Sequence, residues 1–279
     1  MKTHKIHKLF ILSALIILIG AFLLSKNLQV SESKTKGLLI PHHLLAKLNI
    51  EKIYSENAND AVDTVILISP NHFYYGYNDI QTTNQNFEYE NQTLEIDQDL
   101  LKKITKNSST KIENKNYKKE HGITVHVPFI LKSFPNAKVL PIILKRETSE
   151  NELNELIENL NQATKNKNII IIASIDFSHY VDEKIAAKTD EKIINLLRDL
   201  SKNKTPSSLA KITTLAKTDT GKNKEAVAMD SPESLYIFLK LLENKNTQNF
   251  TLFARTSTKT LTGIKKPDSN TSHIFGVFE

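Results

Sequence analysis

The feature that most constrains the fold is a set of short apolar, β-branched runs separated by stretches with helical periodicity. Three such runs are residues 64–69 (TVILIS), 138–144 (KVLPIIL) and 168–174 (NIIIIAS). Continuous apolar runs of this length are typical of strands that are buried on both faces of a sheet. Because helical patterns alternate with them, the sequence predicts a single α/β domain with a mostly parallel central sheet flanked by helices.

The same patterns predict the remaining elements. We expect a first strand at residues 37–41, followed by a helix through about residue 57. The other expected elements are helices near 149–165, 182–200 and 230–244, late strands at 251–256 and 273–278, and a hairpin insertion within 76–96, which lacks a helical period.

Composition narrows the chemistry. The 279 residues include no cysteine, which excludes disulfides, thiolate metal sites and cysteine nucleophiles. Seven glycines and the absence of a G-x-G-x-x-G or Walker A motif argue against a phosphate cradle. The formal net charge of +6 includes lysines around one N-terminal apolar run, and the others are scattered, so we expect no nucleic-acid partner. Metal or acid–base chemistry would have to be carried by histidines and carboxylates.

The N-terminus combines a lysine-containing head with an apolar run, residues 9–24 (LFILSALIILIGAFLL). This pattern predicts a signal anchor or signal peptide at residues 1–26, followed by a polar linker at 27–36. An uncleaved hydrophobic helix is favoured because no clear A-x-A cleavage site follows, and a buried core helix is the alternative. We therefore expect a single-pass cell-membrane protein with an extracytoplasmic domain, or a secreted protein if the segment is cleaved.

Histidines follow three of the predicted strands. His42 and His43 follow the first strand in IPHH, and His72 follows the second in ILISPNH. His179 follows the NIIIIAS strand in SIDFSHY, with Asp176 three residues before it. In an open α/β sheet, ligands collect outside the carboxyl ends of the strands. We therefore expect these side chains to gather at one edge of the sheet.

A further pair, Glu120 and His121, begins a predicted helix in EHGITVHVPF. His121 adds to the histidine group, whereas Glu120 could also serve only to complement the helix dipole. His126 lies on another side of that helix and is interpreted as structural, as is His273. Two histidines and one carboxylate form the ligand set of non-haem Fe(II) sites, and a further histidine can act as acid or base near neutral pH.

Five motifs (IPHH, ISPNH, EHGITVHVPF, SIDFSHY and MDSPESLYIFL) occur in the order and spacing of the MEMO family, called AmmeMemoRadiSam system protein B in bacteria and archaea. The chain resembles this family over about residues 37–279. The resemblance implies a MEMO-like α/β domain whose fold is related to the class III extradiol ring-cleavage dioxygenases. It also implies that His42 and His72 are metal ligands.

For the remaining site residues, the resemblance implies that His179 and His121 are second ligands or acid–base residues. Glu120 matches the family's E-H-S-I-E element together with His121. Asp176 lies in the segment that matches the S-D-F-S-H-Y motif. We group these four residues as candidate catalytic residues.

The chain also departs from the family pattern. The P-H-A-G-Y motif is shortened to PHH, and the cysteine of the C-G-R-G-P element has no counterpart. Alignment on Pro232 places Ala228 at the cysteine position, with Asp230 two residues on. The ring-cleavage dioxygenases use a glutamate at the corresponding place, so we expect Asp230 to complete a site with His42 and His72. The alternative is that Asp230 is a helix N-cap.

The resemblance implies a divalent metal, in the first place Fe(II), with Zn or Cu as alternatives. The corresponding function is non-haem iron redox or dioxygenase-like chemistry in an extracytoplasmic protein. Two alternatives stay open: a non-catalytic binding module with a degraded metal site, and a hydrolase with a metal-activated water. We expect a small-molecule or peptide ligand at the sheet edge and membrane contact through the N-terminal helix. Whether the chain is an enzyme stays open, because a fold does not confer an activity.

Overall fold

The computed structural model describes residues 34–216, 227–247, 249–263 and 270–279, all within one compact unit. The first half contains β1 (Gly37–Ile40), η1 (Leu44–Ala46), α2 (Lys47–Glu56), β2 (Thr64–Pro70), β3 (Ile80–Thr82), β4 (Phe87–Tyr89), β5 (Gln92–Leu94), α3 (Gln98–Thr105), β6 (Lys111–Ile112), α4 (His121–Thr124) and α5 (Val127–Ser133). The second half contains β7 (Lys138–Leu144), α6 (Glu150–Ala163), β8 (Ile169–Ser174), β9 (Phe177–His179), α7 (Glu183–Asn203), α8 (Leu209–Ala216), β10 (Val227–Met229), α9 (Pro232–Asn244), β11 (Phe250–Ser257), α10 (Thr258–Thr262) and β12 (Thr271–Phe278).

One large sheet organises the domain, with strand order β10-β9-β12-β1-β8-β2-β7-β3-β6 and β11 paired to β12. Its centre, β1-β8-β2-β7, is parallel throughout. Antiparallel pairs flank this centre, β12 on β1 and β3 on β7. The predicted single α/β domain with a mostly parallel central sheet flanked by helices is confirmed, and the antiparallel edges refine it.

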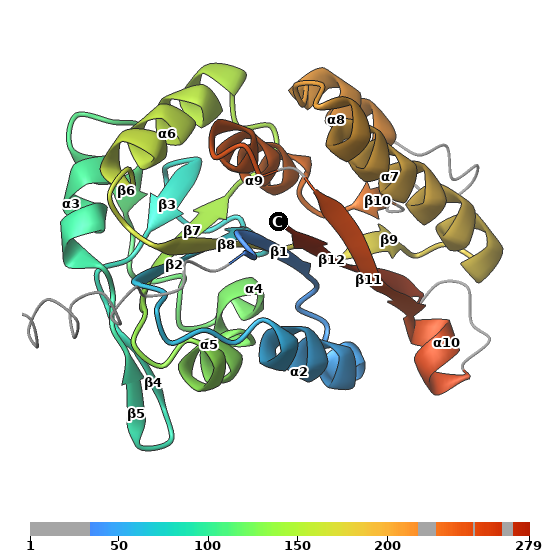
Figure 1. The fold of residues 1–279 in the computed structure, drawn as a ribbon, viewed down its shortest axis with the longest axis horizontal. Coiled ribbons are helices and arrows are strands. Elements are labelled where there is room, and N and C mark those ends of the chain that lie inside the picture. The colour runs from blue at the N-terminus through green and yellow to red at the C-terminus, as the bar shows by residue number, and fades with distance from the viewer. Residues whose placement is uncertain (1–33, 217–226, 248, 264–269) are drawn as a thin grey trace, which may run out of the picture. The chain divides into compact units, whose positions relative to one another are not determined.

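Helices cover both faces of the sheet. In Figure 1, α2, α4 and α5 lie below it, and α6, α9, α7 and α8 lie above it. Every residue of β2 and of β8 is buried, as their continuous apolar sequences predicted. Burying an aliphatic side chain of this size contributes roughly 1.5–3 kcal/mol, so these two strands are a main source of stability.

The parallel register brings three strand ends to one level. Ile40 at the end of β1 pairs with Ser174 at the end of β8, and Ile68 of β2 pairs with Ala173. The chain segments that follow these strands therefore leave the sheet at the same carboxyl edge. This edge carries the candidate site.

The connections show smaller differences from the expected elements. The hairpin predicted within residues 76–96 is present as β4 and β5, which form a separate two-stranded sheet. The helix expected from residue 230 begins at Pro232, because the hydroxyl of Ser231 accepts a hydrogen bond from the backbone N–H of Ser234 and caps it. Asp230 is therefore free of the capping role that was its alternative.

The predicted membrane localisation requires correction. Among the described residues, no helix is long and apolar enough to cross a membrane. The longest of them, α7, carries lysine, glutamate and aspartate side chains along its length. This finding contradicts the predicted transmembrane helix, signal anchor and single-pass localisation. Residues 1–26, on which that prediction rested, lie outside the described residues.

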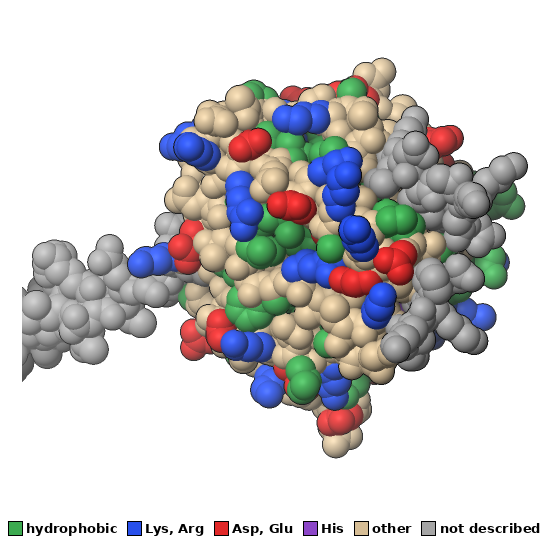
Figure 2. Space-filling model, turned by 90° about the vertical axis from the view of Figure 1, so that its right-hand side faces the viewer, with side chains coloured by type: hydrophobic (Ala, Val, Ile, Leu, Met, Phe, Trp, Pro, Cys, Tyr) green, Lys and Arg blue, Asp and Glu red, His purple; other side chains and the backbone are tan. Residues whose placement is uncertain are grey.

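Charged side chains of both signs share the surface on the side that bears α7 and α10. Figure 2 shows this side, with lysine and arginine side chains interspersed among aspartate and glutamate. Such mixing produces no extended field of a single sign.

Candidate metal site

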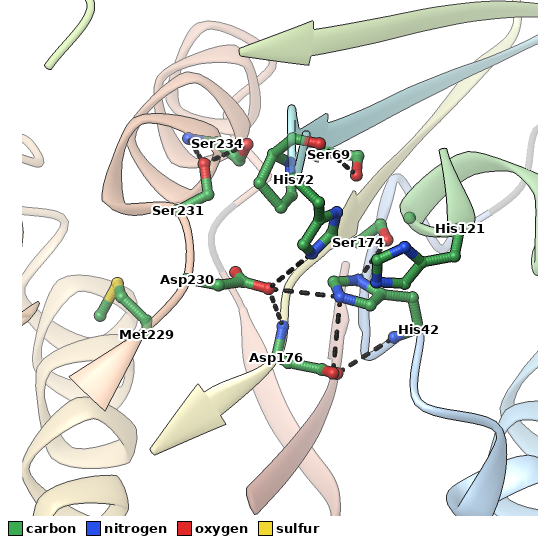
Figure 3. Close-up of polar contacts among 12 residues, drawn as sticks. His42, Ser69, His72, His121, Ser174, Asp176, Met229, Asp230, Ser231 and Ser234 are labelled. Atoms are coloured by element: carbon green, nitrogen blue, oxygen red, sulfur yellow. Dashed lines mark hydrogen bonds and ion pairs between the residues drawn. The ribbon is translucent and has the colours of Figure 1, made fainter. Parts of the chain in front are cut away.

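The site residues lie just beyond the ends of four strands. His42 follows β1, His72 follows β2, and Asp176 follows β8. Asp230 occupies the short segment between β10 and α9. Figure 3 shows these four side chains pointing toward one another, with His121 beside His42.

Asp230 is the centre of this arrangement. Its Oδ2 lies 3.3 Å from His42 Nε2 and 3.7 Å from His72 Nε2. The same oxygen accepts a hydrogen bond from the backbone N–H of Asp176 at 3.1 Å. Its second oxygen, Oδ1, is buried and has no hydrogen-bond partner within the described part of the chain. One carboxylate oxygen thus faces both histidines, and the other is unsatisfied.

The backbone around Asp230 is held from two sides. The guanidinium of Arg146 donates to the carbonyl oxygens of Asp230 at 3.3 Å and Met229 at 3.2 Å. The N–H of Asp230 donates to the carbonyl of Asp176 at 3.1 Å. Because its main chain is fixed in this way, the carboxylate has a defined position next to the histidines.

Asp176 holds His42 at two points. One carboxylate oxygen accepts a hydrogen bond from the backbone N–H of His42 at 3.2 Å, and the other lies 3.4 Å from its Nε2. On the opposite side of the ring, His42 Nδ1 lies 3.0 Å from the hydroxyl of Ser174. Both ring nitrogens of His42 therefore have a buried polar neighbour.

Glu120 lies behind His72 and fixes its orientation. This fully buried carboxylate is 2.6 Å from His72 Nδ1 and accepts hydrogen bonds from the backbone N–H groups of His72 and Gly122, both at 3.0 Å. A Cβ at position 122 would lie 1.9 Å from the Ser69 hydroxyl, so the close approach of α4 to β2 requires glycine. His72 is left with Nε2 directed at Asp230.

His121 and His179 complete the predicted group. The ring of His121 lies 3.9 Å from that of His72 and 5.1 Å from that of His42, and about half of its side chain is exposed. His179 ends β9 and lines a hollow of about 280 Å³ together with His72 and Asp230. Its Nδ1 is buried without a hydrogen-bond partner among the described residues.

The hollow has a rim that sequence reasoning missed. Tyr74, Arg146 and Tyr180 line it, and both tyrosines adopt left-handed backbone angles, with φ of 52° and 58°. This conformation is strained for an aromatic residue, and such strain concentrates at functional sites. A signal was present for Tyr74, which belongs to the aromatic run FYYGY directly after His72.

Electrostatics favour protonated histidines between the carboxylates. Burial opposes the charged form of His42, but Asp176 and Asp230 outweigh it and raise its pKa. Burial also opposes the charged form of His72, yet hydrogen bonds to Asp230 and Glu120 raise its pKa to about 10. Burial acts to raise the pKa of Asp230, but the hydrogen bonds from both histidines hold it well below its usual range.

The two other histidines behave in the opposite way. Burial, together with the positive charges of His72 and His42, lowers the pKa of His121 to about 4. Burial also lowers the pKa of His179, against the attraction of Asp230 and Asp176. Both rings are therefore neutral at pH 7, which is the form that binds a metal.

The donor set fits a metal ion. Two overlapping groups have ligand atoms within 4.8 Å of one another: His42 with His72 and His121, and His42 with Asp176 and Asp230. Neutral imidazoles and carboxylates are the ligands that Fe(II), Zn(II) and Cu(II) accept in proteins. The buried Oδ1 of Asp230, which has no hydrogen-bond partner among the described residues, adds a carboxylate oxygen to the atoms available to such an ion.

Comparison with known proteins places the chain among named relatives. A family model described as Memo-like protein matches residues 14–269. A MEMO1 family protein of Nitrosopumilus maritimus is 28% identical over 172 residues, which cover 60% of this chain and 62% of that protein. A MEMO1 family protein of Methanosarcina barkeri is 28% identical over 180 residues, or 63% and 66%. One of Saccharolobus islandicus is 30% identical over 142 residues, 50% of each chain, so the chain spans about half the length of such curated relatives.

A solved structure has the same fold. An uncharacterized protein from Escherichia coli K12 superimposes with a TM-score of 0.51 and 10% sequence identity. The superposition covers 86% of this chain and 99% of that chain. At this identity the likeness shows a shared fold alone.

Proposed function

The chain belongs to the MEMO family, and on this premise we propose that it binds a divalent metal ion through His42, His72 and Asp230. One observation carries the proposal: the Nε2 atoms of both histidines converge on Oδ2 of Asp230. His42 and His72 belong to the first of the two candidate groups described above, and Asp230 belongs, with His42, to the second. Two histidines and one carboxylate are the ligand set of non-haem Fe(II) sites.

The charge balance of the site supports a divalent ion. The pKa of His72, raised to about 10, means that this ring carries an extra proton in the metal-free protein at pH 7, and Asp176 and Asp230 raise the pKa of His42 as well. Binding of a metal requires neutral rings, so the extra proton of His72 leaves as the ion enters. A divalent cation then supplies positive charge beside Asp176, Asp230 and Glu120, so these buried carboxylates remain compensated.

The site would direct chemistry through its own residues. When bound, Fe(II) would supply redox chemistry of the dioxygenase type. Glu120 keeps His72 Nε2 aimed at the ion by holding Nδ1. His179, neutral and with a buried Nδ1 that has no partner among the described residues, is placed to accept a proton from a ligand in the adjoining hollow. That hollow, about 280 Å³, suits a small molecule.

Metal binding is tested on protein purified without oxygen. We expect about one metal ion per chain by elemental analysis, and calorimetric titration of chelator-treated protein with Fe(II), Zn(II) and Cu(II) ranks the three metals. His42→Ala should abolish binding. His43→Ala is the matched control, because its ring accepts a bond from the N–H of Leu45 and caps η1 outside the site. Wild-type protein without stoichiometric metal after such a titration would refute the proposal.

The redox part needs a separate measurement. Oxygen consumption by Fe(II)-loaded protein with catechol-type compounds should exceed that of Zn(II)-loaded protein, since zinc has no redox chemistry. His179→Gln should lower turnover of the iron-loaded protein while leaving its metal content unchanged. Equal oxygen consumption with both metals would exclude dioxygenase-like chemistry on these compounds and leave a metal site without that activity.

A further inference from the structure

A buried chain of hydrogen bonds leads from His42 away from the hollow into the core. His42 Nδ1 lies 3.0 Å from the hydroxyl of Ser174, and that hydroxyl lies 3.0 Å from His126 Nε2. His126 Nδ1 lies in turn 3.0 Å from the hydroxyl of Tyr54. All four side chains are at most 3% exposed. They come from four places in the fold: the segment after β1, the end of β8, the N-cap of α5 and the last turn of α2.

The Ser174 hydroxyl has a single proton, which limits where the protons of the two histidines can lie along this series of hydrogen bonds. The hydroxyl has no other hydrogen-bond partner in the part of the chain that the structure describes. It can donate to one histidine nitrogen only, so it is fully satisfied when the other histidine donates to it. If His42 Nδ1 and His126 Nε2 both carried protons, the hydroxyl oxygen would accept both bonds and its own proton would be buried without an acceptor, at a cost of roughly 1–3 kcal/mol. A proton on one of these nitrogens therefore disfavours a proton on the other.

His126 is a neutral ring with one proton, so the state of its Nε2 determines the state of its Nδ1. Burial, and then the positive charge of His42, lowers its pKa to about 3, so the ring is neutral at pH 7. A neutral ring whose Nε2 is unprotonated must carry its proton on Nδ1, and the hydroxyl oxygen of Tyr54 then accepts a hydrogen bond from that N–H. In the opposite arrangement Tyr54 donates to Nδ1, and the proton of His126 is on Nε2.

We propose that Ser174 and His126 are positioning residues that couple the tautomers of His42 and His126. When His42 presents an unprotonated Nε2 to a metal ion, its proton is on Nδ1, and His126 carries its own proton on Nδ1 as well. The metal part of this inference rests on the proposed function, but the coupling of the two rings does not. Metal-binding histidines commonly owe their orientation and basicity to such a partner on the second ring nitrogen.

The test combines nitrogen spectroscopy with metal affinity. Protein labelled with ¹⁵N at histidine is measured by long-range ¹H–¹⁵N correlation, before and after addition of Zn(II), which is diamagnetic. His126→Gln identifies the His126 signals. In the zinc-loaded wild type we expect the protons of His42 and His126 both on Nδ1. A proton on Nε2 of His126 in that state overturns the proposal.

Variants of Ser174 test whether the coupling matters for binding. Ser174→Ala leaves His42 Nδ1 without an acceptor, and its affinity for Zn(II) should fall about 10-fold. Ser69→Ala is the matched control. This buried serine lies near the end of the neighbouring strand β2 and donates to the carbonyl of Pro70, so it takes no part in the hydrogen bonds that join His42, Ser174 and His126. Ser174→Thr keeps the hydroxyl and should restore the affinity. Equal zinc affinity of Ser174→Ala and Ser69→Ala overturns the proposal.

Failure of the metal site can be told apart from failure of the coupling. If the wild type binds no zinc, the proposed function is wrong, and the spectra of the metal-free protein decide the coupling alone. His42 and His126 must then both carry a proton on Nδ1, or both lack one there. A mixed pattern overturns the coupling. This measurement needs only the wild type, so it holds even if Ser174→Ala does not fold.

Discussion

Replacement of Glu120 by glutamine removes one charge from the core while keeping the shape of the side chain. In the wild type its carboxylate receives three hydrogen bonds, one from the His72 ring and two from backbone N–H groups. An amide has only one acceptor oxygen, so its NH₂ group must face at least one of these donors. Glu120→Gln therefore leaves a buried N–H unsatisfied and weakens the contact with the protonated His72 ring.

The expected loss of stability follows from these contacts. An unsatisfied buried donor costs roughly 1–3 kcal/mol, and hydrogen bonds to a charged group contribute about 1.5–3 kcal/mol. Because the glutamine still accepts some of the bonds, we expect the free energy of unfolding at pH 7 to fall by about 3 kcal/mol. Chemical denaturation of the chelator-treated protein measures this difference.

The pH dependence gives a second, independent signature. The pKa of His72 in the folded protein is raised to about 10, so its contribution is complete below 6.5 and is lost as the pH rises through 10. The difference between 6.5 and about 10 sets an upper limit of about 5 kcal/mol for this contribution. In Glu120→Gln one of the two groups that raise this pKa is neutral. The decline in stability between pH 7 and 10 should therefore be smaller than in the wild type.

Glu113→Gln is the matched control. Glu113 also accepts backbone hydrogen bonds, from Tyr77 and Asn78, but it has no histidine partner. This variant should keep the wild-type decline in stability between pH 7 and 10. A loss below about 1 kcal/mol for Glu120→Gln contradicts the assigned role of its three bonds. An unchanged decline contradicts the assigned coupling to His72.

Three further predictions concern the frame of the site. Tyr74→Gly should be more stable than Tyr74→Ala by about 1 kcal/mol in chemical denaturation, because glycine adopts the left-handed angle without strain; equal stabilities would contradict this. Burial favours the neutral form of Asp97, but hydrogen bonds from Lys167 and Thr64 lower its pKa, so the stability it contributes is present above pH 3.8 and lost as the pH falls through its folded pKa. The stability difference between wild type and Asp97→Asn should thus shrink between pH 5 and 2, and a constant difference would refute the assignment. Ile171→Ala, in the centre of β8, should cost about 2–5 kcal/mol, whereas Ile185→Ala, at an exposed position of α7, should change stability by less than about 0.5 kcal/mol.

The central fold could be predicted because its signal is local. The runs TVILIS, KVLPIIL and NIIIIAS became β2, β7 and β8, since strands buried on both faces must be apolar at every position. The short strands β9 and β10 carry no such signal. Each has three residues and exists through antiparallel pairing between segments about 50 positions apart. Pairing of this kind depends on tertiary contacts, which the sequence pattern does not contain.

The candidate site likewise has features that the sequence could predict and features that it could not. The position of His42 and His72 beyond two parallel strands placed them at one edge before any geometry was known. The orientation of Asp230 could not be predicted, because either it or Ser231 could cap α9 and the local sequence allows both. The contact of His126 with Ser174 joins residues 48 positions apart, and no spacing rule connects a helix start with the end of a strand. His126 was accordingly interpreted as structural.

The level at which β1, β8 and β2 end has a consequence for how much change the domain tolerates. Ladder hydrogen bonds set that level, so the donor atoms of the site do not depend on the length of the connections between strands. The β4–β5 hairpin lies in the connection between β2 and β7, and Glu90 and Asn91 at its tip are exposed. Residues inserted or deleted at this tip lengthen or shorten the hairpin and leave β2 in register. Fusion tags, spectroscopic labels or natural insertions can therefore be carried there while the constellation at the sheet edge is preserved.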